Sequence, residues 1–229
     1  MASVIPTREY DDGFLVMVTK RGIIKKTEMS KFKNIRESGL IALNIRDDDE
    51  LVSVLRTSGQ DEVFIATNNG VGIRFNESGV RQLGRTATGV KGIKLGGEDC
   101  VIGAVILSPD NTEQKVLFVS ENGFGKCTGF DEFRLQSRSG KGTRAYKITP
   151  KTGKLLGIEL VTDKDELMLI NSDGVIIRIR IGDISTSGRN AMGVKLINLG
   201  EGVTVVGLAK VAEEVLGEEA EEVVEDGIE

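Results

Sequence analysis

Residues 63–70 read Val-Phe-Ile-Ala-Thr-Asn-Asn-Gly, an apolar run that ends in a glycine turn. Asn-Gly and Asp-Gly between β-branched runs are strong signals for a β-hairpin, because the turn residues must tolerate a positive φ angle. The pattern occurs four times, with its turn glycines 48, 53 and 51 residues apart, at Gly22, Gly70, Gly123 and Gly174. The chain is therefore built from four copies of one unit.

Each copy continues with two further signatures. A loop with arginine and glycine comes first, as in Gly-Arg-Thr-Ala-Thr-Gly at 84–89, and it leads into a short apolar strand such as 40–43 or 194–197. A longer apolar strand closes the unit, at 51–55, 101–106, 155–160 and 203–208. Four strands in about 50 residues are typical of propeller blades, which are stable only when neighbouring blades stack.

We therefore predict an all-β, propeller-like domain over residues 1–211. Its blades are expected at about 11–58, 59–110, 111–163 and 164–211. Residues 3–10, which read Ser-Val-Ile-Pro-Thr-Arg-Glu-Tyr, match the closing strand of a preceding blade. We accordingly expect the chain to be a fragment of a larger array.

The charge of the chain is unevenly distributed. Residues 212–229 contain nine acidic residues and no basic one, whereas residues 1–211 carry 30 basic and 26 acidic residues, a net charge of +4. The acidic tail is expected to be a disordered, solvated end. The alternative is a tethered polyanion that competes with an anionic partner for the basic body of the domain.

The composition limits the chemistry. The chain has no His and 2 Cys in 229 residues, which excludes imidazole general bases and His metal sites. No apolar run approaches the ~20 residues that a membrane-spanning helix needs. We expect no catalytic residue, no metal, no cofactor and no membrane partner, in a cytoplasmic protein.

The units closely resemble the C-terminal domain of the DNA gyrase A subunit, the DNA-wrapping domain of a bacterial type IIA topoisomerase. The resemblance rests on Asn-Ile-Arg-Glu-Ser-Gly-Leu-Ile-Ala at 34–42, Gly-Arg-Thr-Ala-Thr-Gly-Val-Lys-Gly-Ile at 84–93 and Asp-Ile-Ser-Thr-Ser-Gly-Arg at 183–189. It implies a β-pinwheel in which adjacent blades exchange strands. It also implies duplex DNA bent around a basic outer rim, in support of ATP-dependent supercoiling.

The resemblance also implies partners. The chain would act with the remainder of the gyrase A subunit, through which it would join the B subunit in a nucleoid-associated heterotetramer, while the fragment itself is expected to be a monomer. One departure from the family concerns its box, Gln-Arg-Arg-Gly-Gly-Lys-Gly, which is represented here only by Gln-Ser-Arg-Ser-Gly-Lys-Gly at 136–142. This departure keeps the equivalent domain of the topoisomerase IV A subunit open as an alternative.

Basic residues recur at equivalent positions of the units, and we take them as candidate DNA-binding residues. One group lies on the strand after each turn glycine: Lys25, Lys26, Arg74, Lys126, Arg178 and Arg180. A second group precedes a glycine in the arginine–glycine loops: Arg36, Arg85, Arg138 and Arg189. A third group follows these loops: Lys91, Lys141, Arg144 and Lys195. Together they predict a positive stripe around the edge of the disc, which suits a curved polyanion.

A protein-interaction propeller of the WD or kelch type is the alternative from another functional class. It predicts grooves over the face of the disc and binding that is insensitive to salt. The Trp-Asp and Gly-His signatures of WD blades are missing from the sequence. Because no helix is expected for the major groove, DNA binding would depend on the phosphate backbone and DNA shape, with little base specificity.

Overall fold

The structure is a computed structural model that describes residues 12–108, 111 and 113–211. Within this part of the chain all regular elements are strands or short 3₁₀ turns. The first two repeats contribute β1 (Phe14–Thr19), β2 (Ile23–Glu28), η1 (Met29–Phe32), β3 (Leu51–Thr57), β4 (Glu62–Thr67), β5 (Val71–Asn76), η2 (Glu77–Gly79), β6 (Val90–Lys91) and β7 (Val101–Leu107). The last two contribute β8 (Lys115–Ser120), β9 (Phe124–Thr128), η3 (Phe130–Glu132), β10 (Thr143–Arg144), β11 (Leu155–Val161), β12 (Glu166–Asn171), β13 (Ile176–Arg180), η4 (Ile181–Asp183), β14 (Val194–Lys195) and β15 (Val205–Val211).

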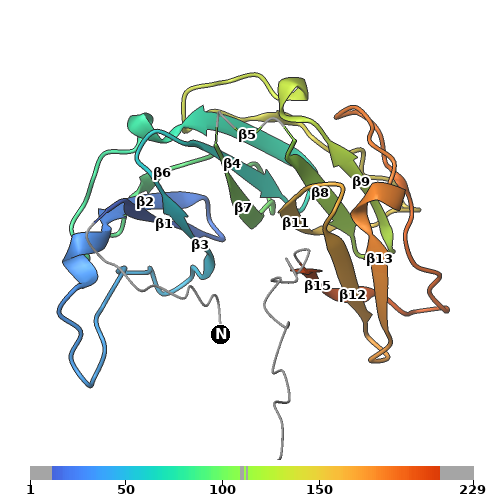
Figure 1. Ribbon diagram of the computed structural model, residues 1–229, viewed down its shortest axis with the longest axis horizontal. Coiled ribbons are helices and arrows are strands. Elements are labelled where there is room, and N and C mark those ends of the chain that lie inside the picture. Colours follow the sequence, from blue (N-terminus) through green and yellow to red (C-terminus); the bar gives the residue numbers. More distant parts are fainter. Residues whose placement is uncertain (1–11, 109–110, 112, 212–229) are drawn as a thin grey trace, which may run out of the picture.

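The strands form four antiparallel sheets, which we call blades 1 to 4. Their strand orders, from the inner to the outer strand, are β3-β1-β2-β6, β7-β4-β5-β10, β11-β8-β9-β14 and β15-β12-β13. Figure 1 shows the blades side by side in an open arc, with the inner strands along its concave side. The all-β, propeller-like fold predicted from the repeats is confirmed.

The outer strand of each complete blade comes from the next repeat along the chain. β6 pairs with β2, β10 pairs with β5, and β14 pairs with β9, in each case over two residue pairs. This is the strand exchange that the resemblance implies. Blade 4 differs from the prediction of four strands, because among the described residues β13 pairs with β12 alone.

The hydrophobic core is divided into three clusters that lie between neighbouring blades. The first joins Ile24 of blade 1 to Ile65 of blade 2, and the third joins Leu117 of blade 3 to Leu169 of blade 4. The second contains Phe64 and Phe133, whose ring centroids are 4.6 Å apart. Each blade therefore buries its apolar faces against its neighbours rather than within itself.

Three other expectations concern the ends of the repeats. Residues 40–43 do not form the predicted strand, because no neighbouring strand lies beside them in the described part of the chain. The closing strand expected at residues 3–10 and the acidic tail at 212–229 lie outside the described residues.

A glycine precedes each exchanged strand because the backbones cross closely there. Gly89 (φ +107°) and Gly142 (φ +71°) adopt left-handed conformations, and a Cβ atom on them would lie 2.7 Å and 2.6 Å from the carbonyl oxygens of Ile24 and Gly72. Gly193 (φ +78°) lies closer still to the Gly125 carbonyl. These positions require glycine both for the positive φ angle and for the space.

We expect Gly193→Ala to destabilise the domain more than Gly202→Ala. Gly202 also has a positive φ angle (+74°), but nothing lies within 4 Å of its missing Cβ. The control, Gly202→Ala, should lower the free energy of unfolding by roughly 1–2 kcal/mol, the cost of a left-handed conformation for an L-residue. Gly193→Ala should lower it by roughly 1–3 kcal/mol more, because the exchanged strand must shift. Urea unfolding measures both values, and equal losses would contradict the close approach.

Candidate nucleic-acid interface

Three of the candidate lysines are buried at the junctions between blades. Lys25, Lys26 and Lys126 retain 0%, 6% and 0% of their accessible surface. Their predicted place on an exposed stripe is therefore wrong. The prediction failed for a physical reason: in blades 1 to 3 the exchanged segment of the next repeat covers the strand after the turn glycine. The alternation of residues within one strand does not reveal that cover.

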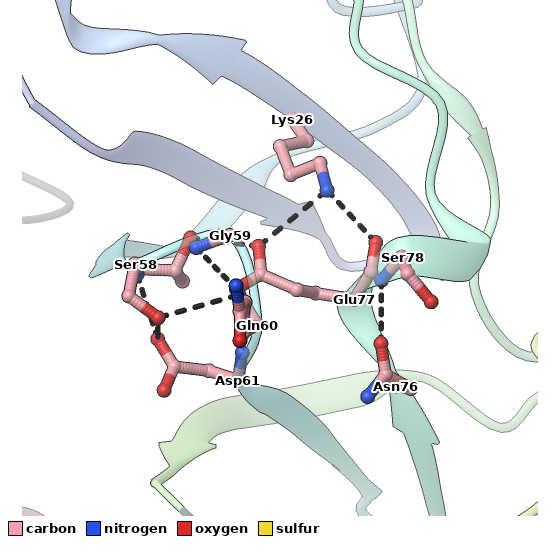
Figure 2. A network of polar contacts seen from close by, with 9 residues as sticks. Lys26, Ser58, Gly59, Gln60, Asp61, Asn76, Glu77 and Ser78 are labelled. Atoms are coloured by element: carbon pink, nitrogen blue, oxygen red, sulfur yellow. Dashed lines mark hydrogen bonds and ion pairs between the residues drawn. The ribbon is translucent and has the colours of Figure 1, made fainter.

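Lys26 closes the junction between blades 1 and 2. Its Nζ donates to the Glu77 carbonyl oxygen at 3.0 Å and lies 3.6 Å from the Glu77 carboxylate. That carboxylate is buried and also accepts from the Thr57 hydroxyl at 2.8 Å. It accepts as well from the backbone N–H groups of Gly59 (2.8 Å) and Asp61 (2.9 Å), which lie beside Glu77 in Figure 2. Both oxygens of the Glu77 carboxylate thus accept hydrogen bonds, which offset the cost of burying its charge.

Lys25 and Lys126 hold the exchanged loops from beneath. Lys25 Nζ donates to the carbonyl oxygens of Ala42 and Arg85, and Lys126 Nζ donates to that of Gly188 at 2.7 Å. Burial lowers the pKa of both lysines to about 8, and for Lys25 the charge of Arg85 contributes to that shift. These lysines stabilise the loops, and their ammonium groups do not face outward.

The arginines on the same strands have mixed environments. Arg74 pairs with Glu62 and donates to the carbonyl oxygens of Phe130 and Phe133 in the next repeat, so it too closes a blade junction. Arg178 pairs with Glu166, and Arg180 lies 3.1 Å from Asp183, but both arginine side chains are more than half exposed. Among the candidates on these strands, only these last two face solvent.

The arginine–glycine loops are joined to one another. Arg138 donates to the carbonyl oxygens of Gly79 at 2.7 Å and Lys91 at 3.0 Å, and the guanidinium of Arg189 donates to that of Arg144 at 3.4 Å. These two arginines and Arg85 are half-buried, whereas Arg36 is exposed. The loop arginines of repeats 3 and 4 therefore position the preceding exchanged strand.

The exchanged loops and strands form one continuous surface, which we call the outer band and define as residues 84–94, 136–147 and 188–198. Consecutive segments contact each other through backbone hydrogen bonds, from Lys94 N to Gly140 O at 2.8 Å and from Lys147 N to Ala191 O at 3.2 Å. Each segment crosses the outer side of a different blade (Figure 1). The band therefore follows the convex side of the arc.

The outer band carries a repeated set of exposed cations. Lys91, Arg144 and Lys195 are the second residues of β6, β10 and β14, so each occupies the same place on blades 1, 2 and 3. All three are exposed, as is Lys141. Sequence reasoning missed Lys94, although its spacing from Lys91 repeats the spacing of Lys147 from Arg144. The candidate DNA-binding residues that follow the arginine–glycine loops, Lys91, Lys141, Arg144 and Lys195, thus all lie exposed on the outer band.

Comparison with known proteins agrees with this geometry. The family described as "DNA gyrase C-terminal domain, beta-propeller" matches residues 13–58, 61–108, 114–162 and 165–212. The chain belongs to this family. The DNA gyrase A subunit of Clostridium acetobutylicum is 54% identical over 210 residues, which cover 91% of this chain and 25% of that protein. The DNA gyrase A subunit of Staphylococcus aureus (strain MRSA252) is 45% identical over 224 residues, which cover 96% of this chain and 25% of that protein.

Two solved structures extend the comparison. A crystal structure of the C-terminal domain of DNA topoisomerase IV has a TM-score of 0.84 at 28% identity and covers 91% of this chain and 65% of its own. A structure of the DNA gyrase A C-terminal domain has a TM-score of 0.78 at 27% identity. The match covers 89% of this chain and 68% of that domain. The chain therefore spans about a quarter of the length of its curated gyrase relatives and about two thirds of these solved domains.

Within the described residues, no helix has the length and apolar character to cross a bilayer.

We expect the effect of Lys126 on stability to depend on pH. The pKa of Lys126 in the folded chain, about 8, lies below the ordinary value of 10.5. At a pH between these two values, Lys126 therefore binds more protons in the unfolded chain than in the folded chain. The contribution of Lys126 to the free energy of unfolding therefore rises with pH across that window. The stability difference between the native chain and Lys126→Met should shift in favour of the native chain from about pH 7 to about pH 10.

Urea unfolding at the two pH values measures that difference. Lys154→Met is the matched control, because Lys154 is exposed. A pH-independent difference for Lys126→Met would mean that Lys126 is not titrated across the window as its burial requires.

Proposed function

We propose that this chain is the part of a DNA gyrase A subunit that binds and bends duplex DNA along the outer band. The observation that carries the proposal is the recurrence of an exposed cation, Lys91, Arg144 or Lys195, at the same place on three successive blades. A polyanion that follows the convex side would meet one such cation on each blade, and neutralised phosphates release counterions. The family of the chain supports the same function.

DNA recognition is proposed to be independent of sequence. The described elements are strands and 3₁₀ turns, and none of them is an α-helix that could enter the major groove. The cations lie on loops and two-residue strands at the rim, where they can contact phosphates and follow the shape of the duplex. The exposed candidates that remain from the sequence analysis are Arg36, Lys91, Lys141, Arg144, Arg178, Arg180 and Lys195.

The proposed setting is a heterotetramer of gyrase A and B subunits in the bacterial cytoplasm, bound to the nucleoid. The parent enzyme would be an ATP-dependent type II topoisomerase whose catalytic residues lie in the remainder of the A subunit or in the B subunit. The topoisomerase IV alternative draws support from the structural similarity at 28% identity, whereas the relatives at 54% and 45% identity belong to DNA gyrase. We therefore favour gyrase.

We expect removal of the outer-band cations to flatten the salt dependence of DNA binding. The triple variant Lys91→Gln, Arg144→Gln and Lys195→Gln should bind duplex DNA more weakly, with a slope of log K against log[salt] reduced by about 0.9 for each phosphate that is no longer neutralised. The control triple variant, Arg56→Gln, Lys154→Gln and Lys210→Gln, removes the same charge from exposed residues outside the band. Equal effects of the two variants, measured by fluorescence anisotropy, would contradict the band as the binding surface.

We also expect this chain to bind DNA while constraining few supercoils on its own. Bending a 20–30 bp site costs about 1–6 kcal/mol, which is repaid only if contacts continue around the curve. The outer band crosses three blades, and the only box-like string is the degenerate one at 136–142. Resealing a nicked plasmid with the chain bound should therefore shift the linking number less than the full-length gyrase A subunit does. An equal shift would show that these blades suffice for wrapping.

A further inference from the structure

Two lysines line a groove at the turn of blade 3, and no carboxylate stands among the described residues that line it. The groove has a volume of about 360 Å³. Its lining combines the hairpin turn and the loop before β11 with residues from β14 onward, and it includes Asn122, Phe124, Lys151, Lys195 and Thr204. Because Lys195 belongs to β14, the groove continues the outer band onto the end of the blade that carries its turn glycine. We call this end the turn end.

Neither lysine is neutralised by an acid. Lys151 and Lys195 are exposed, and within the described part of the chain neither forms an ion pair. Lys151 Nζ lies 5.2 Å from the centroid of the Phe124 ring, and the side-chain amide of Asn122 donates to the Lys151 carbonyl oxygen at 3.3 Å. An ammonium group over an aromatic face keeps its charge and its N–H donors. Glu201 lies on the neighbouring loop but does not line the groove, so the groove has an excess of positive charge.

Lys151 stands where the first two repeats have an acid. Counted from the last glycine of each arginine–glycine loop, the ninth residue is in turn Asp48, Glu98, Lys151 and Gly202. The structure supports the equivalence of the first three, because the residue after each accepts a hydrogen bond from a backbone N–H of the turn. The acceptors are Asp49, Asp99 and Thr152, and the donors are Arg21, Asn69 and Asn122.

The corresponding groove of blade 1 is balanced in charge. It has a volume of about 660 Å³ and is lined by five basic and five acidic residues, among which Arg21 pairs with Asp48 at 2.7 Å. Lys91, the equivalent of Lys195, also lines it. This groove is open although three more blades follow blade 1. The position of the chain end therefore does not account for the open groove of blade 3.

We propose that the groove at Lys151 binds a phosphate of duplex DNA, so that the DNA contact extends from the outer band onto the turn end at blade 3. The inference rests on the proposed function of the outer band and adds a contact outside that band. A lysine ammonium binds phosphate as a point charge with three N–H donors. At blade 1 the carboxylates of the equivalent groove offset the basic side chains, so a phosphate gains no such attraction there.

The two grooves together predict the path of the duplex. On blade 1 the duplex meets Lys91 beside acidic residues, whereas on blade 3 it meets Lys195 and Lys151 together. Charges act on one another over about 8–10 Å at physiological salt. The duplex therefore lies nearer to the turn end on blade 3 than on blade 1.

Reductive methylation of the lysines in the full chain, read residue by residue by mass spectrometry with and without a short duplex, tests the site. Lys151 and Lys195 should both react more slowly when the duplex is bound. Lys154 is the matched control and should change little, because it is exposed and does not line the groove. Protection of Lys195 without Lys151 would overturn the groove as a DNA site and leave the outer band intact. Protection of neither would contradict the proposed function as well.

A peptide with the sequence of residues 212–229 distinguishes duplex DNA from an acidic protein segment as the occupant. At equal concentration this peptide should protect Lys151 less than the duplex does. Protection of Lys151 by the peptide and not by the duplex would assign the groove to an acidic peptide and overturn the proposal.

Charge removal tests the same site by affinity. Lys151→Gln should weaken duplex binding and reduce the slope of log K against log[salt] by about 0.9, the value for one phosphate. Lys154→Gln should leave both the affinity and the slope unchanged. A slope that is the same for Lys151→Gln and the native chain would overturn the proposal.

The reciprocal change builds the site on blade 1. Asp48→Lys places a lysine at the position of Lys151 and should increase the slope by about 0.9. The matched control is Glu113→Lys, which makes the same change of charge at the opposite end of blade 3, since Glu113 precedes β8. Equal increases for the two variants would reveal a general effect of net charge and would overturn the assignment of the groove.

Discussion

The structure depends on strand exchange between consecutive repeats. An outer strand of only two residues could not hold a blade together by itself. β6, β10 and β14 each also bring an arginine–glycine loop and a pair of backbone hydrogen bonds to a turn glycine. Each is followed by a buried side chain, which is Ile93, Tyr146 or Ile197. Each exchanged segment therefore links two blades covalently as well as by packing. The cores lie between blades for the same reason, and no single described blade has a core of its own.

Basic residues serve two different purposes in this architecture. Lys25, Lys26 and Lys126 lie under the exchanged segments and donate to backbone carbonyl oxygens. Lys91, Arg144 and Lys195 lie on top of the same segments and face solvent. One set of cations fixes the loops, and the other can meet an anionic ligand on a surface that the first set holds in place.

The blade junctions are not chemically equivalent. Repeat 2 places Glu77 where the other repeats have Met29, Phe130 and Ile181 at the start of the 3₁₀ turn. The buried carboxylate needs Lys26, the Thr57 hydroxyl and two backbone N–H groups, because an unpaired buried charge is strongly destabilising. The junction between blades 1 and 2 thus has a directional polar contact beside its apolar cluster, whereas at the equivalent position Ile181 packs into the apolar cluster between blades 3 and 4.

Local sequence determined the hairpins and their number, because an apolar run before Asn-Gly or Asp-Gly has few alternatives to a β-turn. It also placed Lys91, Lys141, Arg144 and Lys195 after the glycine loops, where a polar residue beside a short strand remains exposed. Only the tertiary structure decided which strand each loop covers. Lys26 and Arg178 hold equivalent positions in their repeats, yet Lys26 is buried beneath the next repeat and Arg178 is exposed. The same reason explains residues 40–43, which have a strand sequence but no strand: a two-residue β-pairing exists only where a partner edge is present.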